Sequence, residues 1–235
     1  MIKKLTASVL MFLIASSVRS QIIIALLFGD KLNTGTLEFG LVVTPILTNL
    51  TNTESNYRSA LNLGLYFNIH PEKKLFLHLE LTAKGKLGAK NIAPYPTGND
   101  SLDVLFSEGS VERIIKGFNV ILVGRYALSQ HVLLDAGIQP DLMFKPKDIF
   151  KSTINDNDLE YSVRIDDHIT RLDFGVTGGL FYKFKPDRKS MGMGLRYVYG
   201  LTDIDKVHPG IQANSAWMLS ITIPVGAAPK AKEAK

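Results

Sequence analysis

The chain contains no cysteine, which excludes a disulfide framework and an acylated N-terminal cysteine. After the first 28 residues it also lacks an apolar run of about 18 residues, the length that a membrane-spanning helix needs. A strong excess of one charge is absent as well: the net charge of +5 falls to about +2 without Lys3, Lys4 and Arg19 of the expected signal. This near-neutral balance argues against a nucleic-acid partner. If the protein is integral to a membrane, only a closed β-barrel remains.

The first residues have the pattern of a secretory signal. Lys3 and Lys4 precede the apolar stretch "LTASVLMFLIA", and Val18 and Ser20 are the small residues expected before a cleavage site at Gln21. The alternative is one uncleaved helix that continues into "IIIALLF" (22–28). It would place Arg19 in the bilayer at a cost of about 2.5–3.5 kcal/mol. We expect a signal peptide at 1–20, a lead-in of uncertain structure at 21–34, a barrel at 35–225 and a disordered basic tail at 226–235.

Eight segments alternate apolar and polar residues with the period of a β-strand. In "LFLHLELTAKGKL" (75–87), the leucines share one parity, whereas His78, Glu80 and Lys84 share the other. The eight segments are residues 36–43, 59–69, 75–87, 113–128, 132–144, 170–184, 191–201 and 216–225. The pattern predicts an all-β fold, an eight-stranded antiparallel up-and-down barrel.

The connections between these segments alternate in length. Short joins occupy 70–74, 129–131 and 185–190, whereas long joins run through 46–57, 88–110, 146–167 and 203–213. Short periplasmic turns and long outer loops are typical of outer-membrane barrels, although soluble lipocalin-type barrels also have eight strands. The pattern predicts an integral protein of the outer membrane of a didermic bacterium, exported by a cleaved signal peptide.

The polar face of the strands decides between a soluble and a membrane barrel. Glycine recurs on it, at 40, 64, 117, 137, 175, 179, 192, 194 and 200, and glycine weakens a strand unless space is short. An eight-stranded barrel has an interior barely wide enough for side chains, so this face fits a crowded lumen. The opposite face carries Tyr126, Phe144, Tyr182 and Trp217 near strand ends, as interfacial girdles do. We therefore expect the leucines to face lipid.

Several segments resemble the PorT-type, porin-like family of small outer-membrane β-barrels. They are "TLEFGLVV", "LNLGLYFNI", "KKLFLHLELTAKGKLGAK" and "LRYVYGLTDID", and the resemblance extends over about residues 36–225. It implies an outer-membrane barrel, and the best-known namesake of the family is linked to protein secretion. One departure is the end of the chain, "GAAPKAKEAK", which replaces the terminal aromatic that serves barrel insertion.

The charged residues of the polar face are expected to form a paired network in the lumen, because a buried charge without a partner is costly. The predicted network is Glu38, His78, Glu80, Lys84, Arg113, Arg125, Asp135, Asp141, Arg171, Asp173, Lys183 and Arg196.

Two surface segments are candidates for chemistry. Asp156, Asp158 and Glu160 offer oxygen ligands for a cation, although the glycine of a calcium loop is missing and an Asx-rich turn is the plainer interpretation. "RIDDH" places two acids beside His168, as a hydrolase could, but equally as a solvated loop does, and no nucleophile elbow exists. We expect no catalytic residue, no metal and no cofactor.

Three functions are compatible with this pattern. The first is a non-enzymatic barrel with a role in cell-envelope structure, surface interaction or assistance to a secretion system. The second is a passive small-solute porin, and the third is an outer-membrane hydrolase. The expected partners are outer-membrane lipid and lipopolysaccharide, with envelope or secretion proteins in addition; no nucleic acid is expected, and the barrel is expected to be a monomer.

Overall fold

A computed structural model describes residues 34, 36–187, 189–207 and 210–225. The expected signal peptide, all of the lead-in except Thr34, and the tail lie outside the described residues. The described strands and helix are β1 (Leu37–Leu50), β2 (Arg58–Ile69), β3 (Leu75–Ile92), α2 (Asp100–Phe106), β4 (Ser110–Ala127), β5 (Val132–Ile154), β6 (Asn157–Arg164), β7 (Leu172–Lys183), β8 (Gly192–Gly200) and β9 (Asn214–Pro224). No helix in this described part has the length and apolarity that a transmembrane helix requires.

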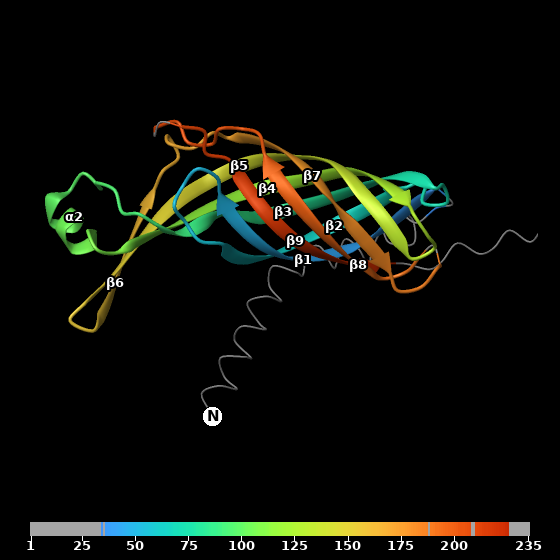
Figure 1. Cartoon of the computed structure of the whole chain (residues 1–235), viewed down its shortest axis with the longest axis horizontal. Coiled ribbons are helices and arrows are strands. Elements are labelled where there is room, and N and C mark those ends of the chain that lie inside the picture. The colour runs from blue at the N-terminus through green and yellow to red at the C-terminus, as the bar shows by residue number, and fades with distance from the viewer. Residues whose placement is uncertain (1–33, 35, 188, 208–209, 226–235) are drawn as a thin grey trace, which may run out of the picture.

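The strands form one closed antiparallel barrel. The sheet order is β4-β3-β2-β1-β9-β8-β7-β5-β6, and an additional β4–β5 pairing closes the ring. Because β6 pairs only with β5, it forms a hairpin outside the ring, and the other eight strands make the barrel (Figure 1). The predicted all-β, eight-stranded barrel is confirmed.

The two ends of the barrel differ. Residues 70–74, 128–131 and 184–191 make short connections at one end, which we call the turn end. The opposite end, the loop end, carries α2, β6 and the longer connection between β8 and β9 (Figure 1). Short and long connections therefore alternate as the sequence indicates.

The expected long joins are partly wrong, because they contain regular structure. β1 continues to Leu50, β3 continues to Ile92, and β5 runs for 23 residues. A strand that crosses a bilayer needs about 9–11 residues, so β5 is more than twice as long as a bilayer requires. The outer parts of β3, β4 and β5, together with β6 and α2, form a projection beyond the ring that we call the extension (Figure 1).

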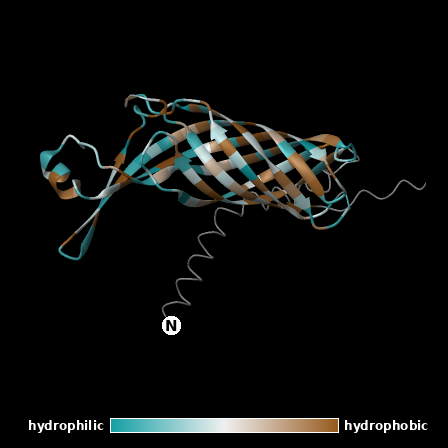
Figure 2. Cartoon of the chain, in the orientation of Figure 1, coloured by the Kyte–Doolittle hydropathy of each residue, from teal (hydrophilic) through white to brown (hydrophobic). Residues whose placement is uncertain are grey.

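The outer face of the ring is apolar. Hydrophobic and hydrophilic residues alternate along the strands (Figure 2), and Leu77, Leu134, Leu180 and Leu195 are exposed. The expected girdle residues are exposed too: Tyr126, Phe144, Tyr182 and Trp217. The interior instead holds buried polar side chains, such as Glu80. This distribution is that of a barrel whose solvent is lipid.

Glycine makes room in the lumen where a large side chain crosses it. A Cβ atom at Gly40 would lie 2.4 Å from the ring of Tyr66, and one at Gly192 would lie 2.5 Å from the ring of Phe181. Any larger residue at these positions would therefore displace an aromatic ring from the lumen.

The seam between the first and last strands contains a gap. β1 pairs with β9 from Gly40 to Val43 and again from Ile46 to Leu50, in one continuous register. Thr44 and Pro45 are skipped, and a proline has no N–H to donate to a ladder. The same two residues do pair with β2 on the other side.

Candidate functional site

A connected polar network crosses the lumen near the turn end. Asn68 Nδ2 donates to Glu38 Oε1 over 3.0 Å, and Asn68 Oδ1 lies 2.6 Å from His78 Nδ1. His78 Nε2 lies 2.8 Å from Glu80 Oε1, and Glu80 is also paired with Arg196. These side chains come from β1, β2, β3 and β8, so the network ties four strands together.

A second ion pair lies in the same layer. Arg125 on β4 donates from Nε and Nη2 to the two carboxylate oxygens of Asp135 on β5, over 2.8 and 2.9 Å. Its guanidinium also lies 4.0 Å from the ring centroid of Phe181. Arg125 and Arg196 are the largest of the fully buried side chains. We call Arg125, Asp135 and Arg196, with Glu38, Asn68, His78 and Glu80, the turn-side layer, and all of them are buried in the lumen.

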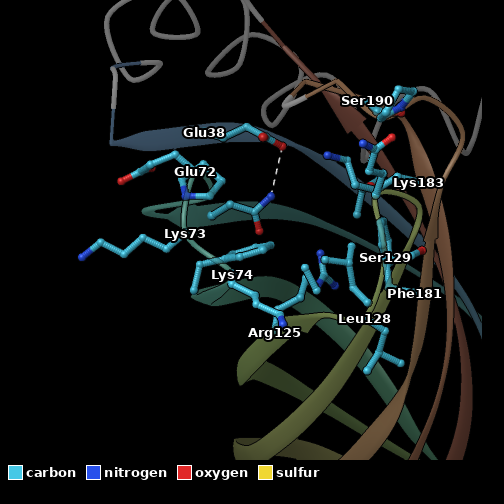
Figure 3. A pocket seen from close by; sticks show the side chains of 18 residues that line it. Glu38, Glu72, Lys73, Lys74, Arg125, Leu128, Ser129, Phe181, Lys183 and Ser190 are labelled. Carbon is cyan, nitrogen blue, oxygen red and sulfur yellow. Dashed lines mark hydrogen bonds between the residues drawn. The ribbon is translucent and has the colours of Figure 1, made fainter.

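A pocket of about 520 Å³ opens between this layer and the turn end. Figure 3 shows its lining, with the hydrogen bond from Asn68 to Glu38 as a dashed line. Lys73 and Lys74 come from the turn between β2 and β3, and Lys183 comes from the end of β7. The mouth at the turn end is therefore rich in basic side chains.

A different arrangement occupies the lumen nearer the loop end. Asp141 on β5 and Asp173 on β7 are directly opposite in the β5–β7 register, and both are buried. Gln139 Nε2 donates to Asp141 Oδ2 over 2.8 Å, and Asn214 Nδ2 donates to Asp173 Oδ2 over 2.6 Å. We call these four residues, with Asn119, the loop-side layer.

Above the ring, the buried Arg113 forms ion pairs with both the extension and a long loop. Arg113 donates to both carboxylate oxygens of Asp148 on β5 and, over 3.1 Å, to Asp205. Tyr95 donates its hydroxyl to Asp148 over 2.6 Å. Burial and the neighbouring Asp148 carboxylate raise the pKa of the Tyr95 phenol well above its ordinary value.

Aromatic side chains stiffen the extension. The ring centroid of Phe150 on β5 lies 5.1 Å from Tyr95, 6.0 Å from Phe106 of α2 and 6.3 Å from Tyr161 of β6. On the outside of α2, Val104 and Leu105 remain exposed and line a groove of about 860 Å³ against β5 and β6. The extension is thus a packed structure with an apolar edge.

The structure places most of the predicted network residues inside the protein. Buried side chains among them are Glu38, His78, Glu80, Arg113, Arg125, Asp135, Asp141, Asp173 and Arg196. Lys183 is partly exposed at the mouth of the turn end. Arg113 lies at the level of the extension rather than in the ring, because β4 starts earlier than the sequence indicates.

Two network predictions are wrong. Lys84 is exposed, because the β3–β4 register shifts between Thr82 and Gly85 and one extra residue turns the following side chains to the opposite face. Arg171 is exposed as well, because it lies before the first residue of β7, in the connection from β6.

The candidate cation loop is not assembled into a site. Asn155 and Asp156 form the tip of the β5–β6 hairpin, both with positive φ, as Asn and Asp tolerate. Asp158 accepts from Thr153, and Glu160 lies 3.5 Å from Lys151. In the described part of the chain, no three His, Asp or Glu side chains converge as metal ligands.

The "RIDDH" segment lacks the geometry of an acid–histidine pair. Arg164 donates to both oxygens of Asp166, over 2.7 Å each, and this pairing holds the pKa of Asp166 below its ordinary value. The buried Nδ1 atom of His168 has no hydrogen-bond partner among the described residues. No carboxylate therefore orients His168 as a base.

Sequence reasoning missed several polar residues of the interior. Asn68, Asn119 and Gln139 lie on the polar parity of strands that the sequence does predict, but they carry no charge. Asp148 and Asp205 fall in segments read as loops. The sequence does contain a pattern that could have predicted β6: Leu159, Tyr161 and Val163 alternate with polar residues. All three pack against the buried core.

Comparison with known proteins places the chain in a family. Solved structures similar to it include Ail, the attachment invasion locus protein of Yersinia pestis (10% identity, 80% of this chain and 98% of that chain covered, TM-score 0.43), and Neisserial surface protein A (8%, 80% and 96%, 0.41). The outer membrane enzyme PagL is also similar (12%, 78% and 99%, 0.37). No curated protein matches the chain. Residues 30–206 match the family described as the outer membrane protein beta-barrel domain, and the chain belongs to this family of outer-membrane proteins.

Proposed function

We propose that this outer-membrane protein is a non-enzymatic, non-conducting barrel that uses its extension to interact with molecules at the cell surface. The observation that carries the proposal is the contrast between a ring with large charged side chains buried in its lumen and a packed projection beyond it. Arg125, Arg196 and Glu80 occupy the lumen where a porin would need an aqueous path, whereas β5 and β6 continue well beyond the bilayer.

The passive porin is the less favoured alternative for a physical reason. A solute would have to separate the Arg125–Asp135 and Arg196–Glu80 pairs, and each separation leaves buried charges without partners. The outer-membrane hydrolase is less favoured because, among the described residues, Asp166 is paired with Arg164 and the buried Nδ1 atom of His168 has no hydrogen-bond partner.

Single-channel recording on the full-length mature protein in planar bilayers tests the non-conducting barrel. We expect no steady open state, and a steady conductance of porin size would overturn the proposal. Heat-modifiable gel migration of the same sample should verify that the barrel is folded. A missing conductance then cannot result from unfolded protein.

The role of the extension needs a separate test. Val104→Asp with Leu105→Asp makes the apolar edge of α2 charged without touching the barrel. We expect the pair to abolish capture of outer-surface molecules by the purified protein, whereas Val207→Asp, an exposed apolar residue of another loop, should leave it intact. Equal loss in both variants would refute a role specific to α2.

A second function, assistance to secretion machinery from the periplasmic side, has its own support. The turn-end mouth presents Lys73, Lys74 and Lys183 around a 520 Å³ pocket, and PorT-type resemblance implies a link to secretion. Cross-linking in whole envelopes tests it: Lys73→Glu with Lys74→Glu should remove a periplasmic cross-link that the wild type makes. An unchanged cross-link pattern would exclude this mouth as the docking surface.

A further inference from the structure

We propose that the loop-side layer is a calcium site inside the barrel, with Asp141 and Asp173 as its charged ligands. The two carboxylates face each other across β5 and β7 at one register position. Side chains opposite one another in an antiparallel pair have Cβ atoms about 4.5–5.5 Å apart, and like charges at this spacing repel. One divalent cation between them neutralises both.

The surrounding ion pairs make this layer exceptional. Buried Glu80 is paired with Arg196, Asp135 with Arg125, and Asp148 and Asp205 share Arg113. Asp141 and Asp173 take part in none of the ion pairs of the described residues. Buried charges in proteins are either paired or bound to metals, and here no basic side chain supplies the pairing.

Unpartnered oxygen atoms provide the independent observation. Gln139 and Asn214 each use their amide nitrogen on a carboxylate, so their amide oxygens, Oε1 and Oδ1, are left. Both oxygens are buried without a hydrogen-bond partner, and so is Oδ1 of Asp141. The three side chains are only 3%, 4% and 5% exposed. Three buried acceptors lie here beside a single unpartnered donor, the amide nitrogen of Asn119. This excess of oxygen atoms is what a cation requires.

The space between these groups has the right size. Gln139, Asp141, Asp173 and Asn214 line one small cavity of about 10 Å³, together with apolar residues such as Leu87 and Val198. This is about the volume that a single water-sized particle needs. Ca²⁺ accepts carboxylate and amide oxygens in flexible geometry, whereas Mg²⁺ demands an ideal octahedron and keeps several waters. A small cavity with two carboxylates and two amides in its lining therefore favours Ca²⁺. Asn119, opposite Asp141 on β4, has an unpartnered amide oxygen and an unpartnered amide nitrogen.

The site would join three strands between which the described residues form no ion pair. Asp141 and Gln139 belong to β5, Asp173 to β7 and Asn214 to β9. Bound calcium would cross-link them beneath the extension, just as Arg125 and Arg196 cross-link strands nearer the turn end.

Equilibrium binding of Ca²⁺ alone to the refolded full-length protein tests the proposal. Because the side chains of the site are buried, barrels refolded in Ca²⁺ are compared with barrels refolded in chelator, and folding is verified by heat-modifiable migration. We expect one saturable site per barrel and a higher unfolding temperature in Ca²⁺. Asp141→Asn and Asp173→Asn should each weaken binding about tenfold or more.

The matched control is Asp158→Asn, an exposed carboxylate of the β5–β6 hairpin, which should bind Ca²⁺ as the wild type does. Three results would overturn the proposal: no saturable binding by the folded wild type, binding retained by the Asp141→Asn, Asp173→Asn double variant, or an equal loss in Asp158→Asn. Stability that rises only on acidification, with no response to Ca²⁺, would assign the two acids to a shared proton and would overturn it as well. If Asp173→Asn does not fold, Asn214→Leu provides the second ligand variant.

Discussion

The two layers of the lumen neutralise buried charge in different ways. In the turn-side layer each aspartate or glutamate has a polar partner of its own, and two of them have a guanidinium. In the loop-side layer two aspartates oppose each other and accept hydrogen bonds from side-chain amides and, at Asp173, from the backbone N–H of Phe174. The two layers therefore differ in the source of positive charge: arginine side chains supply it in the first, and in our proposal a bound cation supplies it in the second.

The largest expected effect is a difference in thiol labelling between the two ends of the barrel, which shows which layer lies nearer the cell exterior. A single cysteine at Thr97 or Asn157, beyond the loop end, should react with an impermeant thiol reagent on whole cells, and one at Glu72 or Pro186 should not. The chain has no native cysteine to confuse the measurement. Reversed labelling would place the turn-side layer outward and leave the fold intact.

Breaking an ion pair of the turn-side layer should have the largest effect on stability. Glu80→Leu leaves Arg196 buried without its carboxylate and should lower the free energy of unfolding by about 3–5 kcal/mol. Denaturant unfolding in lipid measures this loss. A nearly silent Glu80→Leu would mean that Glu80 is solvated and that the lumen assignment is wrong.

The neighbouring residue on the same strand tests the opposite face. Leu79→Lys places a charge toward lipid and should cost about 2–4 kcal/mol if it lies near the bilayer midplane. The same unfolding measurement applies, and the cost should fall for a lysine placed at Leu75, at the strand end. Equal costs at both positions would contradict a depth-dependent lipid face.

The smallest expected effect is on the free energy of unfolding when one aspartate of each layer is replaced. In chelator, Asp141→Asn should raise the free energy of unfolding by about 0.2–1 kcal/mol, because it removes a like-charge pair across β5 and β7. Asp135→Asn should instead lower it, because Arg125 loses its ionic partner. If both variants change stability in the same direction, the proposed difference between the layers does not exist.

Period-two alternation was enough to predict the ring and most of its lumen. The alternation alone predicted that Glu80, Arg125 and Arg196 lie inside the barrel. When one face of a strand contacts lipid, its charged residues can only occupy the other face. It failed at Lys84, since a bulge is a local change of register that depends on the partner strand β4 and has no pattern in β3 alone.

The extension was harder to predict for a different reason. Lys145 and Pro146 interrupt the apolar pattern and resemble a turn, yet β5 continues through them with Lys145 at positive φ. Beyond the bilayer the strands bury only one face against a small aromatic cluster, so the apolar signal is weak. Pairing of the loop-side amides was also beyond the sequence, because Gln139 and Asn214 come from strands that meet only through β7 and β8.

The skipped residues of the β1–β9 seam bear on how the barrel opens and closes. The chain's first and last ring strands pair with each other, so this seam closes the ring. Thr44 and Pro45 divide its ladder into two short paired segments. Either segment can open while the other stays paired. Successive N–H groups of a strand point to opposite neighbours, and both Leu219 and Ser220 also pair with β8. We therefore expect the one of these two amides that faces β1 to exchange with deuterium sooner than the amides of the uninterrupted β7–β8 ladder near Leu180. The folded barrel would then open first at the pairing between β1 and β9.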